Sequence, residues 1–204
     1  MINETAVYVA LIPEDVEPSF VFPPERQAEI DRCSNPRVRQ EKYFVWKLLE
    51  HALRDHFDID VTDMSFSKNE NGKWVSDTCF FSLSHSDRVA AVAVSQTNVG
   101  VDVEAVRRYR DGIEERILSE SEKLPLPSMD TAEAEAYIIE KWSQKESIFK
   151  TLDKKVFEPT RLNTADHPVR SYFFELSGRR YALSVCAQDA DKAKINLNGD
   201  IWQK

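Results

Sequence analysis

The feature that most constrains this 204-residue chain is the segment Gly100–Glu104 (GVDVE), in which two acidic residues alternate with two valines. A β-strand sends residues i and i+2 to the same face, so both carboxylates point one way and the valines point the other. Like charges side by side on a strand repel each other, and the arrangement is favourable mainly when a cation neutralises them. The segment therefore predicts a strand with one apolar, buried face and one cation-binding face.

A second segment supplies a third carboxylate. Trp142–Lys150 (WSQKESIFK) has a helical pattern, in which Glu146 and Lys150 share a face because they are four residues apart. If this helix packs on the strand, Glu146 joins Asp102 and Glu104. Oxygen ligands without histidine or cysteine are typical of Mg²⁺, with Mn²⁺ as the alternative. We therefore predict a metal site formed by Asp102, Glu104 and Glu146.

Together the two segments resemble the paired signatures of the 4′-phosphopantetheinyl transferases. GVDVE is similar to (G/A)-hydrophobic-D-hydrophobic-E, and WSQKESIFK, about forty residues later, is similar to W-x-x-K-E-(A/S)-x-x-K. The upstream segment SLSHS and the chain length resemble the larger, pseudo-dimeric class, of the surfactin-synthetase-activating type. The resemblance is sharp over residues 80–106 and 136–150. It implies Mg²⁺-dependent transfer of 4′-phosphopantetheine from coenzyme A to a serine of an apo acyl or peptidyl carrier protein.

The resemblance also implies roles for individual residues. Glu146 is the expected catalytic base as well as a metal ligand, and Lys150 is expected to stabilise charge on the α-phosphate. The residues leave the base open between Glu146, a metal-activated water and another acid. Glu122 matches an acidic residue often found before the connecting loop of the family, and its alternative role is helix capping. The expected coenzyme contacts are Arg39, Gly72, Lys73, Ser84, His85 and Lys145.

Several of these coenzyme contacts have ordinary structural alternatives. Asn71-Gly72 is a strong hairpin dipeptide, so Lys73 either approaches a phosphate or faces solvent in a plain hairpin. The family commonly carries Gly-Lys-Pro here, whereas this chain has Trp74 in place of proline. The positive charges of the helix that carries Arg39 are otherwise those of a solvated face. A lone histidine is usually structural, but His85 lies between two serines at the end of a strand.

Composition restricts the partners. The net charge of −8 argues against nucleic acid. No run of about eighteen apolar residues and no basic N-terminal region is present, so we expect neither a membrane span nor a signal peptide. Three widely separated cysteines fit reduced thiols in a cytoplasm. We therefore expect a cytoplasmic protein, and a monomer, whose acidic carrier docks on a local basic patch at Arg107, Arg108 and Arg110.

The order of predicted elements indicates an α+β fold. We expect a helix from Glu25 to Leu53, broken at Asn35-Pro36 with Ser34 as a cap, and a second long helix at Thr131–Leu152. The strand at residues 89–94 is expected to pair with the GVDVE strand. The segment FSLS at residues 81–84 is faintly echoed by FELS at residues 174–177. This echo suggests an internal duplication.

The duplication predicts two similar halves, residues 1–98 and 99–204, in a pseudo-two-fold arrangement with antiparallel sheets packed by long helices. The active site is expected at their interface. The polar tail, residues 188–204, receives no role. Two other functions stay open on the residues alone: a non-catalytic protein that binds coenzyme A or a carrier, and a Mg²⁺-dependent phosphohydrolase.

Overall fold

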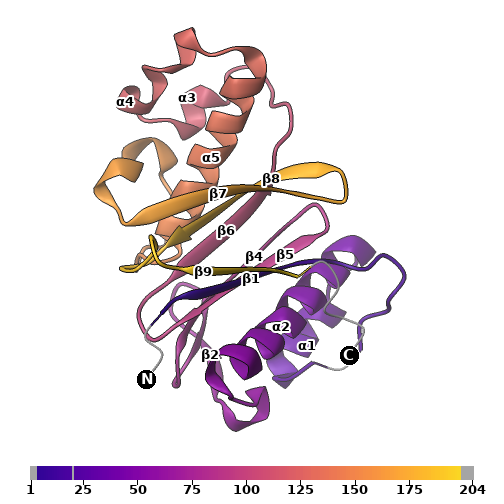
Figure 1. The fold of residues 1–204 in the computed structure, drawn as a ribbon. Coiled ribbons are helices and arrows are strands. Elements are labelled where there is room, and N and C mark those ends of the chain that lie inside the picture. Colours follow the sequence, from indigo (N-terminus) through magenta and orange to yellow (C-terminus); the bar gives the residue numbers. More distant parts are fainter. Residues whose placement is uncertain (1–3, 20, 199–204) are drawn as a thin grey trace.

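The computed structural model describes residues 4–19 and 21–198, and these form a mixed α+β molecule in layers (Figure 1). A long helix of the first half covers one sheet, and a long helix of the second half covers another. The two sheets face each other between the helices. None of the helices in the described part of the chain is long and apolar enough to cross a membrane.

The first half contributes a strand, two helices and two hairpins. The long helix lies on a sheet whose strand order is β4-β5-β1-β9, in which β1 is antiparallel to β5 and parallel to β9. The elements are β1 (Ala6–Leu11), α1 (Pro24–Asp31), α2 (Pro36–Phe57), η1 (Val61–Asp63), β2 (Phe66–Lys68), β3 (Trp74–Ser76), β4 (Phe80–Ser86) and β5 (Val89–Ser95).

The second half has the same order of a strand, a long helix and a hairpin. Its antiparallel sheet has the order β6-β8-β7, so the last strand of the hairpin is again central. The elements are β6 (Gly100–Ala105), α3 (Glu114–Ile117), α4 (Glu120–Lys123), η2 (Leu126–Ser128), α5 (Thr131–Phe149), η3 (Pro159–Arg161), η4 (Thr164–Asp166), β7 (Val169–Leu176), β8 (Arg179–Cys186) and β9 (Lys194–Asn198). The strand β9 joins the sheet of the first half, beside β1.

Alternation along the strands builds two cores. On β1, Tyr8 faces the core under α2, whereas Val7 and Val9 face the core between the two sheets. Val101 and Val103 of β6 enter that same inter-sheet core. The predicted apolar face of the GVDVE strand is thereby confirmed, and its carboxylates face α5.

The long helices begin and end near the predicted positions. The break before α2 is confirmed, but the predicted cap Ser34 is wrong, because the Asn35 side chain accepts hydrogen bonds from the amides of Arg37 and Val38. The helix α5 begins after Asp130, which forms a capping box with Glu133. It ends at Phe149, three residues before the predicted end.

The predicted pairing of β5 with the GVDVE strand is wrong. Both edges of β5 are occupied by β4 and β1, and β6 pairs with β8 instead. The strand β6 lies beside β4, where backbone amides of β6 donate to serine hydroxyls of β4. Side chains of one sheet therefore hold the edge of the other.

Candidate active site

Gly100 allows the helix α5 to lie directly on β6. A Cβ atom on Gly100 would lie 1.9 Å from the backbone oxygen of Ser147, so no larger residue fits without movement of the helix. Ser143 and Ser147, one turn apart on α5, are fully buried, and the Ser143 hydroxyl donates to the Asp102 carbonyl over 3.1 Å. This close contact places the next turn of α5 over the carboxylates of β6.

Asp102 has one partnered and one unpartnered carboxylate oxygen. Its Oδ1 accepts hydrogen bonds from the Ser84 hydroxyl at 2.8 Å and from Lys150 Nζ at 2.9 Å. Its Oδ2 is buried without a hydrogen-bond partner. A buried carboxylate oxygen without a donor is costly, and a bound cation would remove that cost.

Glu104 lies two residues further along the same strand face. Its Oε2 accepts from the Ser86 hydroxyl at 2.8 Å, and its Oε1 accepts from Trp142 Nε1 at 3.3 Å. Trp142 therefore helps to hold the Glu104 carboxylate. Burial raises the pKa of Glu104, and the neighbouring charge of Asp102 raises it further.

Glu146 completes the acidic cluster from α5. Burial raises its pKa to about 7; the charge of Lys150 opposes this shift, and the charges of Asp102 and Glu104 add to it. The three carboxylates form an all-oxygen donor set of the kind that suits Mg²⁺. As they stand, the described residues contain no group of three acidic, histidine or cysteine side chains placed to hold a metal ion. The ammonium group of Lys150 instead neutralises Asp102.

Three serines of β4 join the two sheets. The hydroxyls of Ser82, Ser84 and Ser86 accept hydrogen bonds from the amides of Val101, Val103 and Ala105 at 3.0, 3.2 and 3.3 Å. The hydroxyls of Ser84 and Ser86 then donate to the carboxylates of β6. The motif SLSHS therefore attaches β4 to β6 and orients both acidic side chains. We call these three residues the serine ladder.

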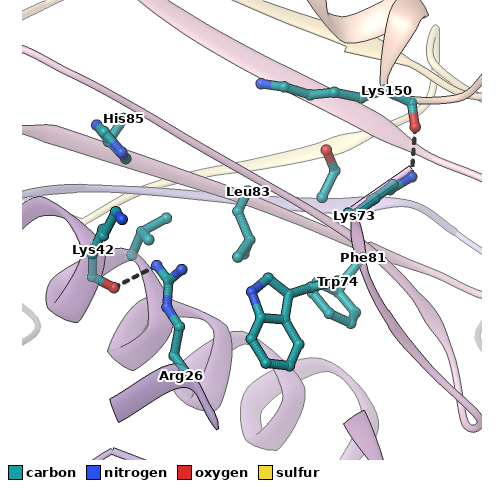
Figure 2. Close-up of a pocket in the computed structure, with 11 residues that line it drawn as sticks. Arg26, Lys42, Lys73, Trp74, Phe81, Leu83, His85 and Lys150 are labelled. Atoms are coloured by element: carbon teal, nitrogen blue, oxygen red, sulfur yellow. Dashed lines mark hydrogen bonds between the residues drawn. The ribbon is translucent and has the colours of Figure 1, made fainter. Parts of the chain in front are cut away.

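A cavity of about 260 Å³ lies on the opposite face of β4 and continues to the end of α5 (Figure 2). It has an apolar floor and a cationic rim, which suits a ligand that combines apolar parts with phosphates. Lys73 donates a hydrogen bond to the Lys150 carbonyl, and burial lowers the pKa of Lys73, with the charge of Lys150 adding to the effect. The cavity is lined by Arg26, Lys42, Val45, Gly72, Lys73, Trp74, Phe81, Ser82, Leu83, His85 and Lys150.

Comparison with known proteins decides the family. A model described as the 4′-phosphopantetheinyl transferase superfamily matches residues 98–198, the part of the chain that carries all three carboxylates. The chain belongs to this superfamily. It is 31% identical over 136 residues to the 4′-phosphopantetheinyl transferase gsp of Aneurinibacillus migulanus, covering 66% of this chain and 57% of the relative. It is 30% identical over 115 residues to the 4′-phosphopantetheinyl transferase Sfp of Bacillus subtilis (strain 168), covering 55% and 51%. The chain thus spans about half the length of these relatives.

The structure of this superfamily member brings together part of the predicted coenzyme site. Gly72, Lys73 and His85 line the cavity beside Lys150. Arg39 is not among the lining residues, although it precedes Lys42 by one turn of α2. The Ser84 hydroxyl is buried on the other face of β4, where it contacts Asp102.

Lys145 and Glu122 form a buried ion pair away from the cavity lining. Lys145 Nζ lies 2.6 Å from Glu122 Oε2 and donates to the carbonyls of Pro159 and Leu162 at 2.7 and 2.6 Å. These three contacts use all the hydrogens of the ammonium group, which leaves Lys145 no donor for a ligand. Glu122 also closes a capping box with Ser119. Burial acts to raise the pKa of Glu122, but Lys145 and backbone amides outweigh it and hold the pKa at about 2.

Sequence reasoning missed two cations and the aromatic lining of the cavity. Lys42 shares a face of α2 with Arg39, so helical spacing offered a signal for it. Arg26 lies on α1, where it is buried over the Trp46 ring and donates to the Lys42 carbonyl. No local pattern in the sequence indicates that α1 lies beside the hairpin that bears Trp74. Only the tertiary structure therefore shows that Arg26 and Trp74 line the same cavity.

Proposed function

We propose that this protein transfers 4′-phosphopantetheine from coenzyme A to a serine of an apo acyl or peptidyl carrier protein, in a Mg²⁺-dependent reaction. The observation that carries the proposal is the position of Lys150, which connects the acidic cluster to the cavity. Its Nζ pairs with Asp102, and the same residue lines the cavity with the cationic rim. A pyrophosphate that spans the two places its leaving phosphate in the cavity and its reacting phosphorus at the carboxylates.

Asp102, Glu104 and Glu146 are the residues that would hold the metal. The unpartnered Asp102 Oδ2 and the raised pKa values of both glutamates support this assignment. When bound, the metal supplies charge neutralisation for the pyrophosphate. The serine ladder and Trp142 hold two of the three carboxylates in place, so the third, Glu146, and the ammonium group of Lys150 are the groups that would move when the metal binds.

Glu146 is the proposed proton acceptor for the serine hydroxyl. A pKa of about 7 lets the carboxyl group take a proton and release it near neutral pH. The serine oxygen forms a bond to the β-phosphorus as the bond to the bridging oxygen breaks. Lys150 is placed to stabilise the negative charge that develops on the departing α-phosphate.

The remaining phosphates of coenzyme A are assigned to the cationic rim. Gly72, Lys73 and His85 line the cavity, and Arg39 lies one helical turn from Lys42. Gly72 has a left-handed φ of +76°, which the hairpin turn requires. Arg26 and Lys42 extend the same positive surface. Ser84 and Lys145, whose polar groups are used within the fold, act through the structure around the site rather than through the nucleotide.

We also propose that the chain arose by duplication, with halves at residues 1–98 and 99–204 related by a pseudo-two-fold axis. The shared strand order supports this, since β5 and β8 are each central, flanked by β4 and β1 or by β7 and β6. The site would then lie between the halves, where the serine ladder meets β6. The three cysteines are free, which fits a reducing cytoplasm, and we expect a monomer.

The test is to incubate the protein with coenzyme A, Mg²⁺ and an apo carrier protein, and then to weigh the carrier. A mass gain of one phosphopantetheine group, lost when Mg²⁺ is chelated, supports the proposal. Consumption of coenzyme A without loading would indicate a phosphohydrolase instead. If coenzyme A binds but is not consumed with any of the acyl and peptidyl carriers tested, the protein is a binding protein. Asp102→Ala should abolish loading in every case where the wild type loads.

A further inference from the structure

A glutamate on α2 lies directly behind His85. Glu41 is buried, and its Oε2 lies 3.3 Å from His85 Nδ1. Phe81, Leu83 and His85 alternate along β4 on the face that lines the cavity, whereas Glu41 lines a separate hollow. The imidazole therefore stands between a carboxylate and the cavity. Its Nε2 is the ring nitrogen left for a ligand.

The carboxylate of Glu41 is itself held in place. Its Oε1 accepts from Arg37 Nε at 3.2 Å, and Arg37 Nη2 contacts Asp87 at 2.6 Å in the β4–β5 turn. Asp87 also pairs with Arg179, and its carbonyl accepts from the Tyr181 hydroxyl at 3.0 Å. The hydrogen bond from His85 lowers the pKa of Glu41; burial opposes this, and Arg37 adds to the lowering. Glu41 is thus an ionised, oriented acceptor.

The lining of the cavity suits an anionic ligand. Arg26, Lys42, Lys73 and Lys150 line it together with His85, and none of its described lining residues is acidic. When Nδ1–H donates to the Glu41 carboxylate, the plane of the ring is set and Nε2 is the nitrogen that meets the ligand. A proton on Nε2 then donates to a phosphate oxygen. Figure 2 shows His85 at the cavity edge near Lys42.

We propose that Glu41 is a positioning residue for His85. It accepts the Nδ1–H hydrogen bond, fixes the plane of the ring and directs Nε2 toward a phosphate of the bound nucleotide. The choice of coenzyme A as the ligand rests on the proposed function. The orientation of the imidazole ring by Glu41 is inferred only from contacts within the free protein. An experiment can therefore refute the proposed function without refuting this orientation, and the reverse.

Glu41→Met tests the proposal, with Glu50→Met as the matched control. Methionine keeps the length and helix propensity of glutamate but offers no carboxylate acceptor. Glu50 lies on the same helix, partly buried and paired with Lys47. We expect Glu41→Met to weaken coenzyme A binding about five- to tenfold by calorimetry, with kcat at saturation within about twofold. The control should bind as the wild type does. Unchanged affinity in a folded Glu41→Met protein would overturn the proposal.

A double-mutant cycle shows whether Glu41 acts through His85. Once His85→Ala has removed the ring, Glu41→Met should have no further effect on binding. An equal loss in both backgrounds would mean that Glu41 acts on the fold or on the ligand directly, and would refute the positioning role.

The free protein offers a readout that depends on neither activity nor the stability of the variant. Long-range ¹H–¹⁵N correlations of His85, assigned by their loss in His85→Ala, should show a proton on Nδ1 in the wild type. A bare Nδ1 in the wild type would overturn the proposal. Absence of coenzyme A binding by the wild type would refute the proposed function, and the His85 spectrum would still judge the role of Glu41.

Discussion

At the scale of single residues, burial gives Glu146 an unusual protonation equilibrium. Its pKa in the folded protein is about 7, against an ordinary value of 4.5, so the folded state binds this proton more tightly than the unfolded chain does. The resulting contribution to stability is fully present below pH 4.5 and is lost as the pH rises through 7. A divalent cation that neutralises the cluster should offset this loss.

Glu146→Gln tests the protonation of this cluster. Without metal, the free energy of unfolding of the wild type should fall by on the order of 1–3 kcal/mol relative to the variant between pH 4.5 and pH 8. Urea unfolding at both pH values measures the difference. If the free energies of unfolding of the two proteins changed with pH in parallel, the raised pKa of Glu146 would be contradicted. In transfer assays the variant should be orders of magnitude slower and only partly rescued by extra Mg²⁺, because glutamine cannot accept the proton.

Lys145→Met tests the buried ion pair. The substitution leaves the Glu122 carboxylate buried without its cation, so we expect a loss of about 3–5 kcal/mol in the free energy of unfolding. Lys123→Met is the control. Among the described residues Lys123 pairs only with the surface carboxylates Glu115 and Glu120, so its substitution should change the urea midpoint little. A stable Lys145→Met protein with weakened coenzyme A binding would instead support the ligand contact implied by the family resemblance.

At the scale of elements, the site depends on how closely α5 approaches β6. The helix brings Glu146 and Lys150 to Asp102 only because the Ser147 backbone meets a residue without a side chain. The end of the helix is also held from the first half, where Lys73 donates to the Lys150 carbonyl and Asn98 donates to that of Thr151. These contacts tie the end of α5 to the β2–β3 hairpin and to the segment before β6.

Gly100→Ala should displace α5 and uncouple the carboxylates. The new methyl group would overlap a backbone oxygen rather than a flexible side chain, so we expect both lowered stability and loss of transfer. Gly178→Ala is the control: Gly178 has a φ of +72° but open space around it, and strain of about 1 kcal/mol without loss of turnover is expected. Thermal unfolding and carrier loading measure the two effects. Full activity of Gly100→Ala would show that the helix contact is not needed.

At the scale of the whole molecule, the serine ladder holds the two sheets together and also positions the carboxylates. Ser82 and Ser84 are both buried and both accept from amides of β6, but only Ser84 donates to a carboxylate. The two residues therefore separate the structural contact from the contact with the site.

Ser82→Ala and Ser84→Ala should destabilise the fold similarly, by about 1–3 kcal/mol, since each leaves a buried amide without an acceptor. Only Ser84→Ala should also raise the Mg²⁺ concentration needed for half-maximal transfer. Urea unfolding and Mg²⁺ titrations of carrier loading distinguish the variants. If the Mg²⁺ dependence of transfer were identical in the two variants, the hydrogen bond from Ser84 to Asp102 would have no role in metal binding.

The surface charge of the molecule restricts how an acidic carrier approaches. The chain has a net charge of −8, so long-range attraction is weak, and docking should depend on the exposed Arg107, Arg108 and Arg110, which follow β6 directly. Reversing all three charges should raise the Michaelis constant for the carrier while leaving that for coenzyme A unchanged. An unchanged Michaelis constant for the carrier would show that the carrier does not dock on these three arginines.

The sequence by itself determined the strand of alternating valines and carboxylates, the helix of Glu146 and Lys150, the hairpin at Gly72 and the family. These are local properties. The strand period of two residues, the helix period of 3.6 residues and a hairpin dipeptide can each be recognised within a single segment of sequence.

Only the tertiary structure decided which segments meet. It placed β6 against the serine ladder rather than against β5, paired Lys145 with Glu122, brought Arg26 to the cavity and set Glu41 behind His85. Each of these contacts joins residues from different elements, and a charged side chain carries no local sign of whether it will meet a ligand, solvent or a buried partner. Packing makes that choice, because a buried charge must find a partner wherever the fold provides one.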